Sequence, residues 1–453
     1  MKKFLNTTRL YFLYALPAVL FFSYYPRFAL GETDFMHLEL SLPLIWLALF
    51  AIISIPSAIA QFKSFRAKPR LYKSMLFTVL AFILYLSISI FWSLNPLRTL
   101  LTAGIVWCLF IVVLSFNGFI FTTSLRQTLL KIFFISTFCI CVFCWLQCIL
   151  DIAGLKRPYT LLCLGCTYRT FGFPHPNGFA IEPQFMGNLL IAPTLTSLYL
   201  LVTEKAKPAR LKLSLLLLFF TSTLFLTFSR GAIYAFCLGA ALLLVLLIIK
   251  TQSMRPLKYL IVIVISFIAT LCAQGIFATL SPTSDTFVTG VTKSIHQLSL
   301  GTIDLRPTVR KPTPDSQPLH QAAEQSTSTF DGYVEESTET RLDLTAAAFR
   351  LSTGSLPTFF FGVGLGGAGK ALGSKEIIQN EYASLLLELG LLGLLLFIAS
   401  VVFVVLLFIK KHPDGLVLIL SVIFAYLLTI FFFSGLPNAL HIYILPFLLY
   451  YLF

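Results

Sequence analysis

The stretch LTFSRGAIYAF, residues 226–236, places one arginine inside an apolar run that extends from Leu213 to Ile249 without another charged residue. At about 1.5 Å per residue the run is too long for one crossing of a bilayer core of about 30 Å. It is long enough for two short helices that turn at Arg230. The sequence therefore predicts a membrane hairpin with Arg230 at its tip, on one face of the bilayer.

The rest of the chain shares this apolar character. Of its 453 residues 57% are hydrophobic and 11% are charged, whereas soluble domains carry about 25% charged residues. No cleavable signal peptide is evident, so the first apolar run is interpreted as the first span. Recurrent runs of roughly 20 apolar residues predict an all-α polytopic membrane protein. We expect about twelve transmembrane helices, at residues 9–26, 38–60, 72–94, 97–117, 128–152, 179–203, 211–229, 231–249, 257–280, 378–409, 415–433 and 438–453.

Basic residues are distributed unevenly between alternate loops. One set of short segments, which includes both termini, holds about nineteen Lys and Arg. Such an excess marks cytoplasmic segments, so we expect cytoplasmic termini and an outward-facing Arg230. The net charge of +14 then reflects topology and anionic lipid, not nucleic acid, because no basic soluble face is present. The alternate set, apart from one long loop, holds Arg27, Arg98, Lys156, Arg157, Arg169 and Arg230.

In the predicted topology, the long polar loops lie only on the outer side of the membrane. The cytoplasmic loops are short and contain no P-loop, glycine-rich nucleotide motif or kinase motif. The outward segments are a loop at about 154–178 and a long one at about 281–377. We therefore divide the chain into spans one to nine (1–280), a large periplasmic loop with short helices (281–377), and spans ten to twelve (378–453), with any chemistry at the outer face.

The long loop divides into three parts by composition. Residues 301–340 are rich in Pro, Ser and Thr, and we expect little packed structure there. RLDLTAAAFRLS, residues 341–352, predicts a short amphipathic helix. FGVGLGGAGKALG, residues 361–373, predicts a glycine-dense turn before the tenth span.

Seven of the nine cysteines lie in predicted spans, where a thiol packs as a small apolar side chain. Cys163 and Cys166 lie in an outward loop instead. They could form a disulfide in an oxidising periplasm or, with His175, part of a zinc site. Both readings stay open.

Five outward-facing motifs follow one another in a definite order. They are TYRTFGFPHPNGFAIEPQFMGN (167–188), TFSRG (227–231), TETRLDLTAAAF (338–349), FGVGLGG (361–367) and QNEYASLLLELGLLGLLLF (379–397). Over roughly residues 165–400 this set resembles the O-antigen ligase and O-antigen polymerase superfamily of membrane glycosyltransferases. The family pattern has an outward Ser-Arg-Gly hairpin, a second arginine in a long periplasmic loop, a glycine turn and a span that starts with His-Asn.

The resemblance implies transfer or polymerisation of a glycan from a polyprenyl (undecaprenyl) diphosphate onto the hydroxyl of a glycan or lipid acceptor. It implies a site at the periplasmic face of the bacterial inner membrane, in contact with the lipid bilayer, with no cofactor and no metal. Arg230 and Arg341 would hold the leaving diphosphate, since the guanidinium fork suits phosphate oxygens and stabilises developing charge. Arg169, Asn380 and Glu381 are further candidates for binding the diphosphate or the glycan.

The sequence departs from the family pattern at Gln379, which stands where the pattern has histidine. Glutamine donates and accepts hydrogen bonds but takes no proton at neutral pH, so Gln379 stays a catalytic candidate without being a base. Substitutes for the base are Glu182, Glu381, His175 and His320. We favour Glu182, which lies at the outward start of a span and close to Arg169. The departure favours a polymerase or a divergent ligase over a strict lipid A-core ligase.

Other interpretations stay open. Arg230 could anchor the hairpin at the lipid headgroups, and Glu388 could be a packing residue beside glycines that allow close helix contact. A transporter or flippase of lipid-linked glycans also needs many spans, but the long outer loop and the scarcity of charge at mid-membrane depth disfavour it. An oligosaccharyltransferase of the GT-C type would use the acids Glu32 and Asp34 with a divalent metal.

Overall fold

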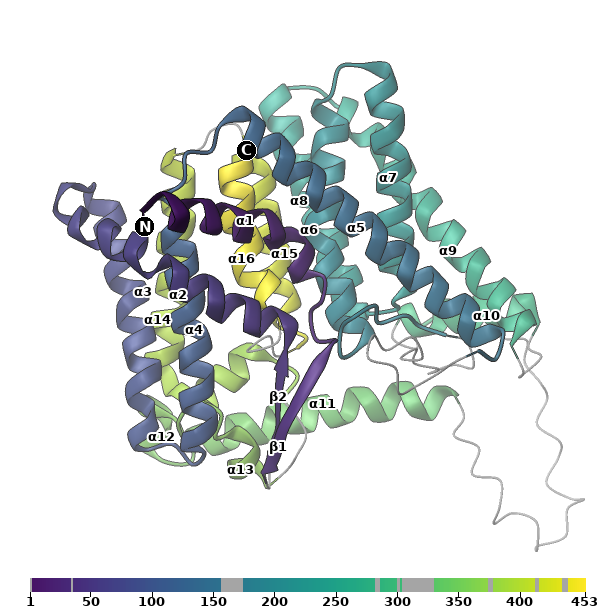
Figure 1. The fold of residues 1–453 in the computed structure, drawn as a ribbon. Coiled ribbons are helices and arrows are strands. Elements are labelled where there is room, and N and C mark those ends of the chain that lie inside the picture. The colour runs from purple at the N-terminus through teal and green to yellow at the C-terminus, as the bar shows by residue number, and fades with distance from the viewer. Residues whose placement is uncertain are drawn as a thin grey trace, which may run out of the picture.

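The computed structural model describes residues 2–33, 36–155, 174–281, 286–299, 302–303, 330–373, 378–411, 415–433 and 439–453. These residues form a helical bundle with a two-stranded sheet and a helix, α11, lying across one end (Figure 1). We call this end the α11 end; both labelled termini lie at the opposite end (Figure 1).

The elements follow in the order α1 (Lys2–Leu20), β1 (Arg27–Thr33), β2 (Met36–Ser41), α2 (Leu42–Lys63), η1 (Phe65–Ala67), α3 (Arg70–Ile88), η2 (Ser89–Phe91), α4 (Pro96–Phe116), α5 (Thr123–Ile152), α6 (Pro183–Thr203), α7 (Lys207–Leu226), α8 (Arg230–Thr251), η3 (Arg255–Tyr259), α9 (Leu260–Leu280), α10 (Phe287–Leu298), α11 (Phe330–Thr353), α12 (Leu356–Phe361), α13 (Ala368–Leu372), α14 (Glu381–Lys411), α15 (Leu416–Thr429) and α16 (Leu440–Leu452).

The helices agree closely with the expected spans. Among the described residues, nine helices are long and apolar enough to cross a membrane, and α15 and α16 are shorter apolar helices at the last two expected positions. The helix α1 (Lys2–Leu20) overlaps the first expected span, 9–26, only over residues 9–20 and is not among these nine. The structure thus confirms a predominantly helical, multi-pass membrane protein.

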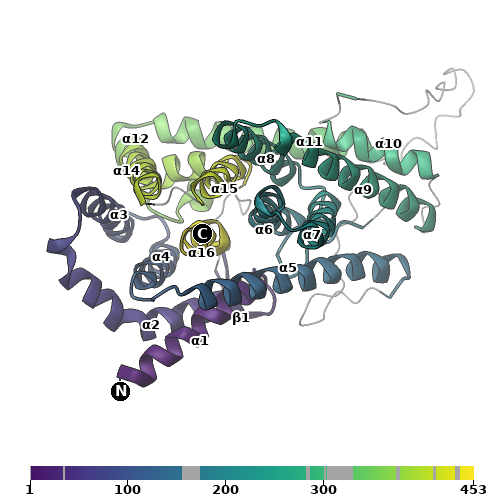
Figure 2. The same ribbon diagram turned by 90° about the horizontal axis from the view of Figure 1, so that it is seen from above.

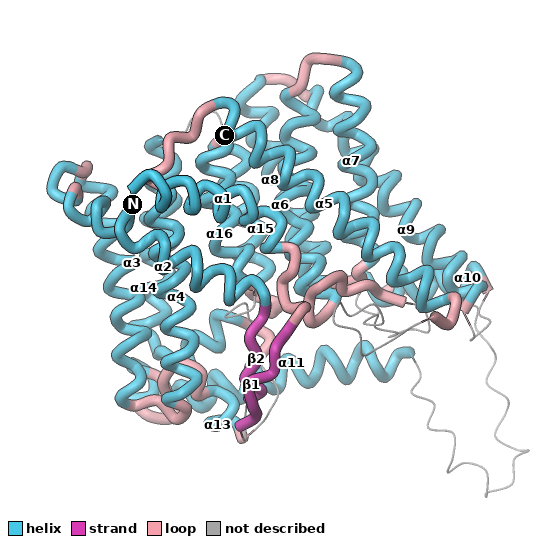
Figure 3. The backbone as a smooth tube through the Cα atoms, viewed as in Figure 1, coloured by secondary structure: helices cyan, strands magenta, loops and turns pink. Residues whose placement is uncertain are grey.

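The strands β1 and β2 are the exception to an all-α fold. They form an antiparallel hairpin that pairs Arg27 with Ser41 and Thr33 with Met36, and it extends toward the α11 end (Figure 3). The second span was expected to begin at residue 38, but α2 begins at Leu42. Pro43 lies in the first turn of α2, where its fixed φ and missing N–H suit a helix start.

Packing around α6 defines the centre of the bundle. In its most apolar window 83% of α6 is buried, against 28% to 50% for the other long apolar helices. Viewed from above, α6 lies inside a ring that includes α5, α7, α8, α15 and α16 (Figure 2). A residue at either end of α6 is therefore in a position to meet several neighbouring helices.

The hairpin predicted at Arg230 is present. The helix α7 ends at Leu226, and α8 begins at Arg230 after the N-cap residue Ser229, whose Oγ accepts a hydrogen bond from the N–H of Ala232 at 3.4 Å. Phe228 takes the left-handed conformation, with φ of 51°. This conformation is costly for a bulky residue and reverses the chain within a few residues.

The glycine turn between α12 and α13 fits into a break in α14. Gly390 has φ of 66° inside α14, and a Cβ there would lie 2.4 Å from the carbonyl oxygen of Phe360. Gly362 similarly approaches the backbone of Glu388, whose Oε1 accepts a hydrogen bond from the N–H of Ala368 at 3.3 Å. Gly390 thus permits a close backbone approach, and Glu388 supports the turn, as the packing interpretation expected.

The long loop differs from the expectation in one respect. A helix was expected only over 341–352, but α11 begins at Phe330, within the segment expected to have little packed structure. Most of the remainder of 301–340 lies outside the described residues. The helix α11 packs against α14, and this contact gives the amphipathic segment a partner that the sequence did not reveal.

Candidate active site

The turn after α15 joins the starts of three helices. The N–H of Glu381, at the start of α14, donates to the carbonyl of Ile430 at 2.9 Å. The Nε2 of Gln184, at the start of α6, donates to the carbonyl of Phe432 at 3.0 Å. Gly231, at the start of α8, approaches Phe432 so closely that an added Cβ would lie 2.8 Å from its Cβ. The starts of α6, α8 and α14 therefore converge on one turn.

Arg341 of α11 acts electrostatically on Glu182 at the start of α6. Burial raises the pKa of the Glu182 carboxyl, and the positive charge of Arg341 opposes that rise. Arg341 is half-buried, whereas Arg350, farther along the same helix, is exposed. Two candidate residues from distant parts of the sequence therefore interact electrostatically in the fold.

Arg230 is the first residue of α8 and is half-buried. It interacts electrostatically with Tyr234, one turn farther along α8, and the Tyr234 hydroxyl donates to the carbonyl of Leu298 in α10. The N-terminal end of a helix carries a partial positive charge. Arg230 adds a full positive charge to the N-terminal end of α8, next to the turn after α15.

Gln379, Asn380 and Glu381 precede and begin α14. The Oδ1 of Asn380 accepts a hydrogen bond from the N–H of Ala383 at 3.1 Å, so this side chain caps the helix. Glu381 is buried. The Oε1 of Gln379 is buried and meets no hydrogen-bond partner among the described residues. Such an atom costs about 1–3 kcal/mol unless water or a ligand satisfies it, so Gln379 is a suitable contact for a polar substrate.

His175 does not have the properties of a general base. It is buried, with its ring centroid 5.0 Å from that of Phe228. Burial lowers the pKa of His175 to about 3, which makes the neutral imidazole a weak base. Compared with His175, Glu182 is the better proton acceptor, because its pKa moves toward neutrality and not away from it.

Several predicted residues cannot be placed. Arg169, His320, Cys163, Cys166 and Asp34 lie outside the described residues. Glu32 lies in β1, but its side chain is not described. The seven described cysteines form no disulfide, and within the described ranges no group of three or more His, Cys, Asp or Glu could hold a metal ion.

Sequence reasoning missed three residues that organise this region. Gln184 and Phe432 hold the turn after α15 against α6 and α8. Arg98, which the sequence analysis counted only as a loop charge, interacts electrostatically with Glu388. The sequence carried one sign of this packing. Gly231, next to Arg230, matches the family pattern, and a glycine at that position permits the close approach of another chain segment, here Phe432.

Comparison with protein families identifies residues 214–398 as matching the family described as O-antigen ligase. This match supports membership of the O-antigen ligase and polymerase superfamily. The matched segment extends from α7 into α14 and contains Arg230, Arg341 and Gln379, whereas Glu182 and the turn after α15 lie outside it. No curated protein matches the chain. The family match indicates a glycosyltransferase-like membrane enzyme.

Proposed function

We propose that the chain transfers or polymerises a glycan from a polyprenyl (undecaprenyl) diphosphate carrier onto an acceptor hydroxyl. The reaction takes place at the α11 end, which faces the periplasm of a bacterial inner membrane. The observation that carries this proposal is the convergence of the starts of α6, α8 and α14 on the turn after α15, with Arg341 close enough to Glu182 to act on it electrostatically. A positive group for the leaving diphosphate and a carboxyl group for the acceptor proton are thereby brought to one place.

The arginines act on the donor. Arg341 and Arg230 bind the diphosphate oxygens, and the guanidinium fork allows two parallel hydrogen bonds to one phosphate. Negative charge accumulates on the diphosphate as the bond to the sugar breaks. Preorganised positive groups stabilise that charge more in the transition state than in the bound donor, which is the condition for raising the rate.

Glu182 acts on the acceptor. The acceptor hydroxyl oxygen attacks the anomeric carbon, the bond from that carbon to the diphosphate oxygen breaks, and the leaving diphosphate takes the electron pair. The hydroxyl proton passes to the Glu182 carboxylate. A raised pKa makes this carboxylate a stronger base than an ordinary glutamate, and the nearby Arg341 keeps a fraction of it ionised.

Gln379 orients a reactant without exchanging a proton. Its buried Oε1 accepts a hydrogen bond from a sugar hydroxyl, and its amide N–H donates one. This division of work, with Glu182 as the base and Gln379 as the orienting group, fits the absence of histidine at position 379. It also favours a polymerase or a divergent ligase.

The experiment uses purified protein in vesicles with a lipid-linked glycan as the donor. We expect chain growth or transfer to a second acceptor by the wild type, and loss of most activity in Arg341→Ala and Glu182→Gln. Arg350→Ala is the matched control, because it removes the same charge from an exposed position of the same helix. Wild-type activity in both Arg341→Ala and Glu182→Gln would refute the proposal.

A further inference from the structure

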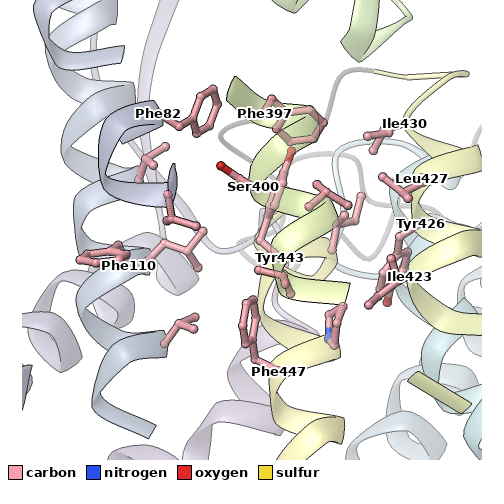
Figure 4. Close-up of a pocket in the computed structure, with 18 of the residues that line it drawn as sticks. Phe82, Phe110, Phe397, Ser400, Ile423, Tyr426, Leu427, Ile430, Tyr443 and Phe447 are labelled. Atoms are coloured by element: carbon pink, nitrogen blue, oxygen red, sulfur yellow. The ribbon is translucent and has the colours of Figure 1, made fainter. Parts of the chain in front are cut away.

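An apolar cavity of about 210 Å³ lies between the pair α3 and α4 and the group α14, α15 and α16. Figure 4 shows Phe82 and Phe110 on one side of it and Tyr443 and Phe447 on another. It exists because α14 packs on α3 while α15 packs on α8 and α6, which leaves space between these two groups of helices. The lining of the cavity is almost entirely aliphatic and aromatic.

The cavity reaches the candidate active site at one end. Its lining includes Glu381 and Ile430, the two residues joined by the hydrogen bond between α14 and the turn after α15. Along α15 the lining extends from Ile430 to Ile423, a length of about 10 Å at 1.5 Å per residue. The cavity therefore leads from the site toward the middle of the membrane.

The interior of the cavity suits a hydrocarbon. Ser400 contributes a hydroxyl, but this hydroxyl already donates to the carbonyl of Leu396 at 2.7 Å. The Tyr443 hydroxyl is buried and meets no hydrogen-bond partner among the described residues, and it interacts electrostatically with Glu381, at the end of the cavity next to the candidate site. The rings of Phe82 and Phe397 lie 5.8 Å apart between centroids and add to the apolar wall. A water molecule needs two to four polar partners in such a place, whereas an apolar chain needs none.

The volume limits the length of the occupant. A dry apolar cavity of about 150 Å³ is sufficient for benzene, a six-carbon ring. By that measure 210 Å³ accommodates about eight carbon atoms, between one and two five-carbon isoprene units. Only a short part of a polyprenyl chain fits, and the position beside Glu381 makes it the part next to the diphosphate.

We propose that this cavity binds the isoprene units of the polyprenyl carrier that lie nearest the diphosphate. The inference rests on the proposed function for the chemical class of the donor, and it adds the place where the lipid is recognised. Methyl branches at every fourth chain carbon give these units a wider cross-section than a straight acyl chain, and the aromatic walls contact them on several sides. The cavity thus selects a branched lipid and aligns its diphosphate with the starts of α6, α8 and α14.

The test uses an isoprenyl diphosphate that carries no sugar and has a photoactivatable diazirine on its second isoprene unit. After irradiation, mass spectrometry locates the label. We expect labelled residues on α4, α14, α15 or α16 along the cavity, and displacement by unlabelled undecaprenyl diphosphate but not by phosphatidylglycerol. Equal displacement by phosphatidylglycerol would identify an ordinary acyl-chain site and overturn the inference.

Matched variants on α14 sharpen the result. Val404→Phe and Val401→Phe fill the cavity, whereas Val402→Phe changes a residue that is 47% exposed on the outer surface of the same helix. Each cavity variant should require at least about tenfold more undecaprenyl diphosphate to displace the probe, and Val402→Phe should match the wild type. Thermal unfolding in detergent verifies folding. Unchanged displacement in both cavity variants would exclude the cavity as the binding place.

The probe separates this inference from the proposed function. Because it carries no glycan, its binding does not depend on transfer. Specific labelling of the cavity by a protein that transfers no glycan would leave the lipid site standing and remove the proposed reaction. Normal transfer combined with labelling outside the cavity would overturn the lipid site and leave the proposed reaction standing.

Discussion

Replacing Arg341 with alanine should change both the rate of transfer and its dependence on pH. Arg341 opposes the rise of the Glu182 pKa that burial causes. Its removal therefore raises the pKa of Glu182 further. If the carboxylate form accepts the acceptor proton, activity is lost as the pH falls through this pKa, and the acidic limb of the pH profile moves to higher pH in the variant.

The size of the rate effect follows from the proposed contact of Arg341 with the leaving diphosphate. Loss of one preorganised donor to a developing anion costs about 2–4 kcal/mol, which is a decrease of roughly 30- to 1,000-fold at a pH where Glu182 is ionised. At lower pH the variant should lose additional activity, since a smaller fraction of its Glu182 is deprotonated. The variant should therefore be impaired more at acidic than at alkaline pH.

Initial rates measured across the pH range in vesicles, with lipid-linked glycan as donor, test this reasoning. Glu182→Gln removes the titrating group and should abolish the acidic limb along with most of the activity. Arg350→Ala should retain the wild-type profile because Arg350 is exposed. A uniform decrease at every pH in Arg341→Ala, with the acidic limb in its wild-type position, would refute the assignment of Glu182 as the base.

Three further predictions concern the other arginine, the absence of a metal and the topology. Arg230→Ala should lose most transfer while still inserting and expressing, and Arg230→Lys should recover little because lysine lacks the planar fork; full activity in Arg230→Ala would return the residue to the role of a headgroup anchor. Transfer should persist in EDTA without ATP, and complete loss that manganese or magnesium restores would favour a GT-C mechanism instead. Reporters fused after Gly290 or Asp331 should be active in the periplasm and those after Lys207 or Arg255 in the cytoplasm; the inverse pattern would place the arginines in the wrong compartment.

The helical segments could be predicted because their causes are local. Each span is a run of apolar residues long enough to cross the bilayer, and water is absent there to satisfy an open backbone. The turn at Arg230 was equally local, since one charge in an otherwise uncharged run marks the point that stays at the surface. The hairpin of β1 and β2 was missed because Leu38 and Leu40 were counted with the apolar helix that follows, although their alternation with Glu39 and Ser41 is a strand pattern.

The candidate site needed the family resemblance and then the fold. The order of the motifs selected Arg230, Arg341, Gln379 and Glu182, but nothing in their spacing states which of them meet. His175 stayed a possible base beside the favoured Glu182 until its burial beside Phe228 was known. A pKa depends on solvent exposure and neighbouring charges, and both are properties of the packed chain.

The sequence by itself determined a multi-pass helical membrane protein and the hairpin at Arg230, and with the family resemblance it supplied a set of candidate site residues. The tertiary structure alone decided that Arg341 acts electrostatically on Glu182, that the starts of α6, α8 and α14 meet at the turn after α15, and that an apolar cavity ends at Glu381. The physical reason is the distance along the chain over which each interaction acts. Hydrophobic length and turn chemistry act between neighbours in the chain, whereas contacts between charges and the space left between helices depend on how distant segments pack.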